Sequence, residues 1–587
     1  MCRAVTQPRG ATPGEGIVAT NGRLGARATG WDRLRAIAGW GAGLLLLAAL
    51  VAVAGAAGRA NAAGGASGDA AVGAVAERAA GTLPLHSPEL CARFYRERGF
   101  RLAWTEDSRL LPAAEALKSA IRRAAGHGLR PDDYLPPEGW RSDEEEGGPG
   151  FLDAPSQAVR DLLLTDAFLT LADHLRGGRA EPGTTPPSAD LTAVLEEALS
   201  TGRIAETLEG LAPSDAGYRG LRGALAWYRA VAAAGGWEPL PETAALRRGD
   251  LSPATALLRQ RLFAEGFLAA PEGPPGMDAD LEAAVRAFQD RYGLETDGVV
   301  GRATRRALNV PVETRVAQVE ANLERLRWRG QLPAARHLRV NTAAFRLEAW
   351  EQGNPVLQMP VVVGATQNPT PVFTGRMTHL VLNPSWNVPP RIAREDLLPQ
   401  LRKDPLRLEE KGFQVLRGWD APQVVDPTTV DWAAVSLQRE GLHFRQRPGP
   451  ENAMGQVKFL FPNRFHVYLH DTPSRDLFSR ARRDFSRGCI RVAEPVRLAE
   501  YVLAGDPRWP PEALTDVLAQ GLERTVYLRE PVSVHIEYFT AWVGKDGAVH
   551  FRTDLYGHDR ELVARLQRDT APDGSLARLA ALDLAGH

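Results

Sequence analysis

The sequence predicts an α+β protein of several domains, and two observations support that prediction. A chain of 587 residues is too long for one hydrophobic core, so two to four domains are expected. Apolar residues follow a helical period over roughly 82–335, whereas from Leu338 onward they form short runs between turn-forming residues, as strands do. The 70 basic and 71 acidic side chains nearly cancel, which argues against a nucleic-acid-binding protein.

The N-terminal residues carry a targeting signal. Residues 1–35 are expected to stay cytoplasmic, because basic residues precede an uncharged, mostly apolar run at 36–57. That run is long enough to anchor the chain in a bilayer, and the small residues at 60–62 also fit cleavage of a signal peptide. Export is therefore expected, with anchoring and release both open. The Ala- and Gly-rich stretch 58–81 is expected to be a flexible linker.

The first half of the exported part is expected to be helical. Residues 82–245 show helical stripes and no catalytic cluster, which predicts a helical domain. A compact unit at 246–312 contains an amphipathic helix from Leu281 to Tyr292, which Gly293 ends. A connecting helix is expected within 313–335.

Residues 336–545 are expected to form a mostly-β domain. It is interrupted at about 384–450 by a Pro-rich, charged insertion with a helical stretch from Arg394 to Arg402, which is too long for a hairpin loop and is expected to act as a lid. A turn at 545–547 predicts a hairpin. The remaining residues, 546–587, are expected to supply a strand, a helix and a tail.

The stretch 466–492 combines a histidine and a cysteine that can act as base and nucleophile. Cys489 follows Gly488 and stands between Arg487 and Arg491, a cationic setting that favours a thiolate. His470 lies 19 positions earlier, far enough for the chain to leave one element and return beside it.

Strand parity predicts how the residues before Cys489 are oriented. On a strand over 465–470, Phe465, Val467 and Leu469 would face a core. His466, Tyr468 and His470 would then share the opposite face, which is either a cleft or a solvated surface.

The cysteines and histidines could also form a zinc site or a disulfide. His466, His470 and Cys489 are residue types of a zinc site, but a strand separates the two histidines by about 13 Å, so no metal is expected. A disulfide between Cys91 and Cys489 is conceivable, yet Cys91 has the helical spacing of a buried apolar residue.

Three stretches resemble known families. The residues YLHDTPSRDLFSRARRDFSRGCIRV are similar to the signature of YkuD-family L,D-transpeptidases, in which a histidine precedes an S-x-G-C-x-R motif. Together with VVVGATQNPTPVF and LNPSWNVPP, they are most similar to the large periplasmic YcbB-like branch. The residues LEAAVRAFQDRYGLETDGVVGRATRRALN resemble a peptidoglycan-binding type 1 module of three helices. The resemblance covers about residues 83–560 and implies a helical scaffold domain, this module and a YkuD-type catalytic domain with a capping insertion.

The resemblance implies a chemistry without metal or cofactor. Cys489 would attack the peptide bond before the terminal D-alanine of a tetrapeptide stem, with His470 as base and then as acid. The thioester would pass to an amine of a second stem and give a 3-3 cross-link in cell-wall biogenesis. Backbone donors near Gly488 and Cys489 would form an oxyanion hole, and Ser486 would order the loop.

The resemblance also implies substrate contacts and partners. Arg491 would pair with a substrate carboxylate, or alternatively form a structural ion pair, and Tyr468 would bind His470 or substrate. The expected partners are peptidoglycan stems, carbapenem-type inhibitors, other wall-synthesis enzymes and the membrane, in the periplasm. Further substrate-binding candidates are Arg487, Trp386 and Asn387.

The sequence leaves several points open. Arg487 and Asp471 depart from the residues common in the family, so the group that orients His470 is not assigned. An L,D-carboxypeptidase that uses water as acceptor and an inactive wall-binding scaffold are the alternative functions. Wall binding by the module and the oligomeric state are also open.

Overall fold

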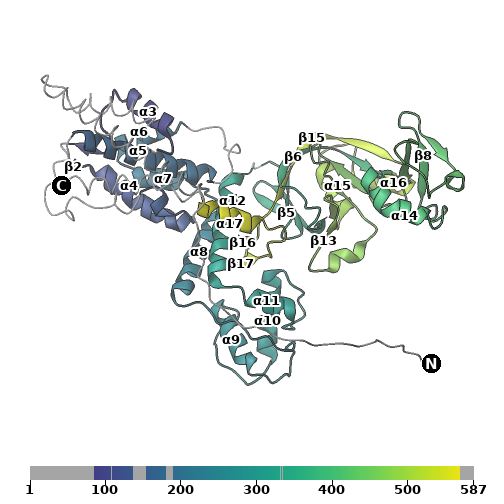
Figure 1. Ribbon diagram of the computed structural model, residues 1–587, viewed down its shortest axis with the longest axis horizontal. Coiled ribbons are helices and arrows are strands. Elements are labelled where there is room, and N and C mark those ends of the chain that lie inside the picture. Colours follow the sequence, from purple (N-terminus) through teal and green to yellow (C-terminus); the bar gives the residue numbers. More distant parts are fainter. Residues whose placement is uncertain are drawn as a thin grey trace, which may run out of the picture.

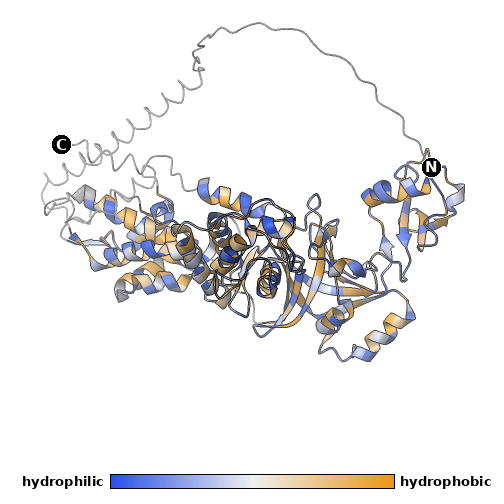
Figure 2. Ribbon diagram, turned by 90° about the horizontal axis from the view of Figure 1, so that it is seen from below, coloured by the Kyte–Doolittle hydropathy of each residue, from blue (hydrophilic) through white to orange (hydrophobic). Residues whose placement is uncertain are grey.

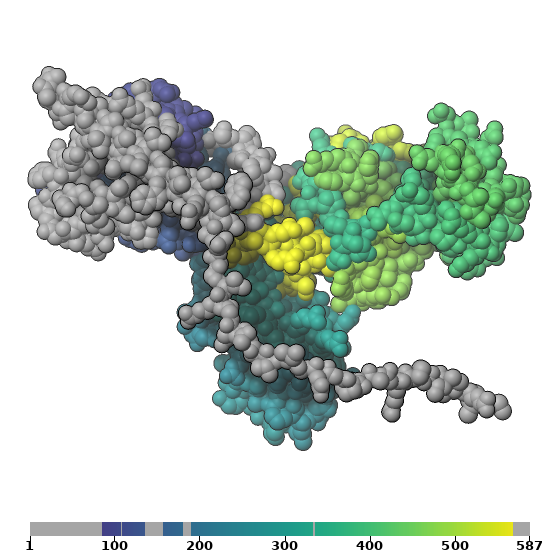
Figure 3. Space-filling model, viewed as in Figure 1, coloured from purple at the N-terminus to yellow at the C-terminus, as the bar shows by residue number. Residues whose placement is uncertain are grey.

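The protein has three lobes in the computed structural model, which describes residues 85–106, 109–135, 154–179, 190–330, 332 and 335–568. Figure 1 shows a helical domain, a small helical module below it and a β domain with its insertion at the far end. The space-filling view shows the small helical module and the β domain with its insertion as separate masses (Figure 3). Within these ranges no helix is long and apolar enough to cross a membrane. The expected cytoplasmic segment, apolar run and linker lie outside them.

The helical domain is built around one central helix, α5 (Ala154–Gly177), with buried residues on most sides. Polar residues of this helix are buried together with its apolar ones, among them Thr165 and Asp166. Its buried carboxylates have partners: Asp161 accepts hydrogen bonds from the Tyr95 hydroxyl at 2.5 Å and from the Trp104 N–H at 2.8 Å. The surrounding elements are α3 (Pro88–Glu97), β1 (Thr105–Glu106), β2 (Arg109–Leu110), α4 (Pro112–Arg123), η1 (Ala124–His127), η2 (Pro131–Asp133), α6 (Leu191–Thr201), α7 (Ile204–Leu211) and α8 (Ala216–Ala233).

The module contains three helices, α9 (Ala254–Ala264), α10 (Ala279–Tyr292) and α11 (Arg302–Leu308). All five residues of the predicted stripe on α10 are buried, and Gly293 ends the helix with φ 65°. The long helix α12 (Val312–Arg329) then joins the lobes. Figure 2 shows hydrophobic and hydrophilic residues intermingled along the helices of the protein, as expected where one side of a helix is buried.

The β domain is a closed barrel of eight strands in the order β5, β14, β12, β11, β6, β15, β3, β4, with β4 pairing back to β5. Inward-facing residues such as Val340, Leu380 and Ile490 are fully buried and fill its core. The strands are β3 (His337–Asn341), β4 (Arg346–Glu351), β5 (Asn354–Gly364), β6 (Phe373–Leu382), β11 (Val457–Leu460), β12 (Leu469–His470), β14 (Ile490–Val492) and β15 (Arg524–Glu537); β13 (Asp484–Ser486) adds to the free side of β5, and η6 (Arg475–Ser479), α15 (Pro495–Leu503) and α16 (Pro511–Gln520) are helical connections.

The expected insertion is a subdomain with its own four-stranded sheet and its own core, which includes Leu401, Trp432 and Phe444. A core of its own explains why so long an insertion can be ordered. Its elements are β7 (Trp386–Asn387), α13 (Pro390–Ile392), η4 (Ala393–Leu397), α14 (Leu398–Leu401), β8 (Phe413–Arg417), β9 (Gln423–Val425), η5 (Pro427–Thr429) and β10 (Leu442–Gln446).

The chain leaves the barrel after β15 and returns to the helical lobes. The predicted hairpin is present as β16 (Ala541–Val543) and β17 (Val549–Phe551), and α17 (His558–Arg568) follows. Phe551 stacks on Tyr292 of the module, with ring centroids 5.5 Å apart, and belongs to the core of the helical lobes. The expected catalytic boundary at residue 545 therefore falls inside this hairpin, which connects the lobes.

Candidate active site

The site begins where two short strands lie side by side. β12 and β14 pair in parallel, with Leu469 opposite Ile490 and His470 opposite Arg491. The Ile490 N–H donates to the Tyr468 carbonyl at 3.1 Å. The chain thus returns beside His470 within those 19 residues, as the sequence predicted. Leu469 and Ile490 are fully buried in the barrel, so their neighbours Tyr468, His470, Cys489 and Arg491 face outward together.

The prediction of a strand over 465–470 was wrong at its start. The strand comprises only Leu469–His470, and Phe465 is 39% exposed instead of buried in a core. His466 has a positive φ of 55°, so it does not continue the alternation. Asn463 explains the difference, because its side chain accepts from the Phe465 N–H at 3.0 Å and donates to the Val467 carbonyl at 2.7 Å. These local bonds hold a turn and replace ladder bonds.

His470 is buried and oriented by a backbone group. Its ring Nδ1–H donates to the carbonyl of Asp471 at 2.5 Å, which leaves Nε2 as the acceptor. Burial, together with the charge of Arg491, lowers the pKa of His470 to about 3. The imidazole is therefore neutral at physiological pH and can take a proton. The group behind His470, which the sequence left open, is a main-chain carbonyl.

The Asp471 carboxylate has a different task. Its Oδ2 accepts from the Gln456 N–H at 2.8 Å, and its Oδ1 lies 3.2 Å from the guanidinium of Arg475. The carboxylate is therefore engaged with the main chain and with Arg475 on the protein side. Asp471 acts on His470 through its main chain.

Cys489 is partly exposed, and its thiol lies 3.9 Å from the His466 carbonyl. Burial raises the pKa of the Cys489 thiol, while a hydrogen bond with Tyr468 and the charges of Lys458 and Arg491 lower it. Burial and the neighbouring cysteine raise the pKa of Tyr468, which stays a hydroxyl donor. A neutral thiol beside a neutral imidazole is thus the resting state.

Sequence reasoning missed Lys458. It lies opposite His470 in the β11–β12 ladder, and its ammonium is 4.1 Å from the centre of the Tyr468 ring. Burial lowers the pKa of Lys458, and the nearby Cys489 opposes that effect. In the described part of the chain no carboxylate lies within ion-pair distance of it. The alternation in VKFL, with Val457 and Phe459 buried, was the available signal that this lysine faces the histidine side.

The loop before Cys489 is held by hydroxyl groups. Ser486 Oγ donates to the Cys489 carbonyl at 2.5 Å and accepts from the Gly488 N–H at 3.1 Å. Thr370 Oγ1 donates to the Gly488 carbonyl at 2.8 Å and accepts from the Gly364 N–H at 2.9 Å. Gly488 has φ 111°, a value that favours glycine. Among the described residues no acceptor was found for the Cys489 N–H.

Arg491 carries a charge that no carboxylate of the described residues neutralises. Within the described ranges it forms no ion pair, and its buried Nε has no hydrogen-bond partner. Burial lowers the pKa of Arg491, and Cys489 opposes that effect. The structural ion pair that was the alternative is therefore not found in the part of the chain that is described.

The remaining predicted substrate residues contact the insertion. Arg487 bridges to Glu395 at 2.6 Å and to Asp396 at 2.9 Å, so it ties the loop before Cys489 to η4. Asn387 accepts from Arg445 Nε at 2.9 Å, and the Trp386 ring contacts that of Phe413. The structure gives none of these three a contact with Cys489 or His470.

The structure also bears on the disulfide and the zinc site that the cysteines and histidines could have formed. Cys91 and Cys489 are both free, and Cys91 is 1% exposed beside Asp166 in the helical domain. In the ranges given above, no group of three or more His, Cys, Asp or Glu side chains is placed to hold a metal ion. His466 approaches Cys489 through its carbonyl.

Comparison with known families assigns the three lobes. Residues 89–225 match the Scaffold domain, and residues 252–308 match a putative peptidoglycan binding domain. Residues 335–509, which contain the barrel strands around Cys489, match the L,D-transpeptidase catalytic domain of the YkuD family. The chain carries a YkuD L,D-transpeptidase domain. The resemblance seen in the sequence, and the α+β architecture that it implied, are confirmed.

Two curated proteins are similar to parts of this chain. A putative L,D-transpeptidase of Haemophilus influenzae is 34% identical over 223 residues, 38% of this chain and 44% of the relative. The N-acetylmuramoyl-L-alanine amidase CwlM of Mycobacterium tuberculosis is 45% identical over 73 residues, 11% of this chain and 18% of the relative. The match therefore spans less than half the length of either relative.

Two solved structures of lower sequence identity are also similar to part of this chain. An L,D-transpeptidase from Stackebrandtia nassauensis is 12% identical, with 51% of this chain and 97% of that chain covered and a TM-score of 0.20. The Ldtfm-avibactam carbamoyl enzyme is 12% identical, with 54% and 98% covered and a TM-score of 0.16. At these scores the two structures add nothing to the assignment.

Proposed function

We propose that the protein is a cysteine L,D-transpeptidase that joins peptidoglycan stem peptides. The observation that carries this proposal is the parallel pairing of β12 with β14, which aligns Tyr468 and His470 with Cys489 and Arg491 on one outward face. That face offers a neutral imidazole whose Nε2 is left to accept, a thiol, and the Arg491 guanidinium, which forms no ion pair within the described residues. These are the groups that acyl transfer through a thioester requires.

The proposed first step is acylation. Cys489 Sγ loses its proton to His470 Nε2 and attacks the carbonyl before the terminal D-alanine of a tetrapeptide stem. The Cys489 N–H, for which no acceptor was found in the described residues, faces the developing oxyanion. Collapse of the tetrahedral intermediate breaks the amide bond, and His470 returns the proton to the D-alanine amine as it leaves. Arg491 holds a carboxylate of the stem.

The second step transfers the acyl group. An amine on another stem attacks the thioester, His470 takes its proton, and Cys489 leaves as the thiolate that His470 then reprotonates. Water must be excluded from the site, because it would otherwise hydrolyse the thioester before the amine attacks. The ion pairs from Arg487 to Glu395 and Asp396 support a role for the insertion as the cover over this site. We further propose that the enzyme works in the periplasm, anchored or released by its N-terminal segment, and that carbapenem-type inhibitors acylate Cys489.

The test is the formation of 3-3 cross-linked dimers from purified tetrapeptide muropeptides, followed by mass spectrometry. Cys489→Ala should abolish dimer formation and acylation by a carbapenem, whereas Cys91→Ala, which changes the other described cysteine, should keep both. Dimer formation by Cys489→Ala would refute the proposal. Release of D-alanine without dimers, even with excess amine acceptor, would instead make the protein an L,D-carboxypeptidase. An unreactive Cys489 in the folded chain would make it a wall-binding scaffold.

A further inference from the structure

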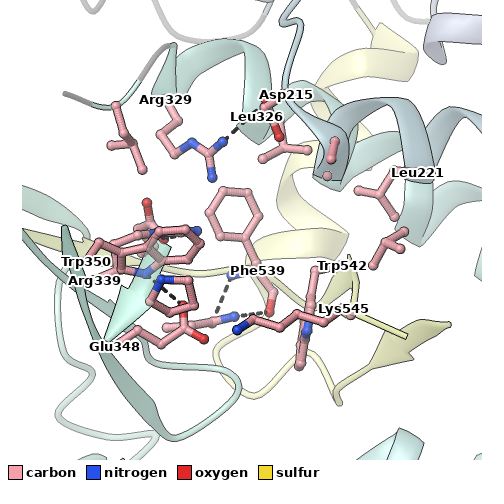
Figure 4. A pocket seen from close by; sticks show the side chains of 18 of the residues that line it. Asp215, Leu221, Leu326, Arg329, Arg339, Glu348, Trp350, Phe539, Trp542 and Lys545 are labelled. Atoms are coloured by element: carbon pink, nitrogen blue, oxygen red, sulfur yellow. Dashed lines mark hydrogen bonds and ion pairs between the residues drawn. The ribbon is translucent and has the colours of Figure 1, made fainter. Parts of the chain in front are cut away.

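A large cleft of about 1120 Å³ lies where the barrel meets the helical lobes. One wall is the outer face of β3 and β4, with Arg339 and Trp350. The other wall combines the start of α8 with the β16–β17 hairpin, which contributes Trp542 and Lys545. Figure 4 shows the side chains from both walls pointing toward one space, with Arg329 at the end of α12 above it. No sequence motif predicted this cleft, because five separate segments form it.

The cleft is distant from Cys489. Pro355, the second residue of β5, lines the cleft. Gly364, the last residue of that strand, donates its N–H to Thr370 Oγ1, which in turn donates to the Gly488 carbonyl in the loop before Cys489. Nine residue steps along a strand span about 30 Å. A ligand in the cleft is therefore separate from the acyl group on the cysteine.

Several polar atoms that line the cleft are buried and have no hydrogen-bond partner among the described residues. They are Arg329 Nε, His337 Nε2 and Glu537 Oε1. The Arg329 side chain is 14% exposed, and its nearest carboxylate, that of Asp215, is 3.6 Å away, beyond hydrogen-bond distance. Glu537 uses only its other oxygen, Oε2, which accepts two bonds from Arg339 at 2.9 and 3.0 Å. Buried polar groups are normally satisfied, so this cluster of donors and acceptors fits a polar ligand.

The charges of the lining select the class of ligand. Four arginine or lysine side chains (Arg329, Arg339, Arg346 and Lys545) face four carboxylates (Asp215, Glu348, Glu537 and Asp546). This balance disfavours a polyanion or a polycation, because half of the charged side chains would repel it. The indole rings of Trp350 and Trp542 line opposite walls. Each ring already contacts an imidazole and a guanidinium, His337 and Arg339 for Trp350 and His550 and Arg552 for Trp542, so the parts of the rings that stay exposed offer the apolar surface. A neutral ligand with hydroxyl and amide groups and apolar faces satisfies every feature, and that is a saccharide.

We propose that this cleft binds an acetylated saccharide, the glycan strand whose stem peptides the Cys489 site processes. The identification of the saccharide as peptidoglycan rests on the function proposed above. In the cleft, a sugar packs against Trp350 and Trp542, a carbonyl or hydroxyl oxygen accepts from Arg329, and a hydroxyl donates to Glu537. Holding the strand about 30 Å from Cys489 keeps the enzyme on the glycan while stems are exchanged.

The experiment measures binding of peptide-free N-acetylglucosamine oligomers to the full chain by calorimetry. All proteins carry Cys489→Ala, so catalysis plays no part. Saturable binding is expected, weakened at least tenfold by Trp542→Ala and at least fivefold by Arg329→Met. Trp419→Ala removes a tryptophan that is 66% exposed on the insertion and should change nothing. Thermal unfolding of each variant should match that of its parent within a few degrees, and Trp542→Phe should recover most of the affinity.

Three outcomes would overturn this proposal. One is no saturable binding of the oligomers. Another is binding that Trp542→Ala and Arg329→Met leave unchanged, which would place the saccharide elsewhere, such as on the 246–312 module. The third is occupation of the cleft by the free tetrapeptide or by inorganic phosphate in its place. None of these affects dimer formation by the chain with intact Cys489, so the two proposals fail independently.

Discussion

Replacing Gly455 with alanine should disturb the group that orients His470. Gly455 has φ 59°, in the left-handed region that an L-residue enters at a cost of about 1 to 2 kcal/mol. A Cβ at this position would lie 2.2 Å from Asp471 Oδ2 and 2.3 Å from its Cγ. The Asp471 side chain, which is 5% exposed, must therefore move away from the Gln456 N–H that it binds at 2.8 Å.

The size of the effect follows from these two contributions. Weakening the bonds of a buried charged acceptor costs about 1 to 3 kcal/mol. Together with the backbone strain, Gly455→Ala should lower the free energy of unfolding by about 2 to 5 kcal/mol. Gly521→Ala is the matched control, since Gly521 ends α16 in the same domain with φ 66° and has no atom within 4 Å of an added Cβ. It should show only the strain of about 1 to 2 kcal/mol.

Two assays check this prediction. Urea unfolding of the full chain, monitored by tryptophan fluorescence, gives the stability difference between the two variants. Carbapenem acylation of Cys489 gives the chemical effect, and we expect a rate at least about tenfold lower in Gly455→Ala because the Asp471 carbonyl no longer fixes the His470 tautomer. The reasoning is refuted if Gly455→Ala unfolds like Gly521→Ala and is acylated at the parental rate.

Three further predictions concern charge in the fold and the site. Lys458→Met should raise the pKa of Cys489 and slow its alkylation by iodoacetamide about tenfold at neutral pH, with recovery in Lys458→Arg; an unchanged pH–rate profile would contradict this. His470 should remain neutral, with its proton on Nδ1, in ¹⁵N NMR spectra at pH 5, because its folded pKa of about 3 lies below the unfolded value of about 6.5. Between these two pKa values the unfolded chain binds a proton at this histidine and the folded chain does not. The contribution of His470 to stability is therefore full above about pH 6.5 and declines as the pH falls toward 3. A charged imidazole in the folded protein at pH 5 would contradict this prediction. Arg327→Met should lower stability by about 3 to 5 kcal/mol in calorimetry, because it breaks the fully buried ion pair between Arg327 and Glu324; a melting temperature equal to the parent's would argue against that role.

Local pattern was enough to predict many of the elements and to single out Cys489 and His470 as the candidate pair. The amphipathic spacing from Leu281 to Tyr292 gave a helix with the predicted buried face, because a helix on a surface buries its apolar stripe wherever it packs. Strand alternation likewise placed Tyr468 and His470 on one side of β12. The predicted alternation was wrong at Phe465 and His466, because hydrogen bonds from the Asn463 side chain to the main chain replace those of a strand. The alternation of apolar and polar residues gives no sign of such hydrogen bonds.

The sequence alone therefore determined the order of the domains and the candidate pair of Cys489 and His470, because periodicity and motif spacing are properties of contiguous residues. Only the tertiary structure decided that a main-chain carbonyl of Asp471 orients His470 and that Lys458 lies opposite it. The same holds for the distant cleft between the lobes, where Arg329 and Trp542 meet. Contacts of this kind join residues far apart in the chain, and strand register and lobe packing set them, which no local pattern encodes.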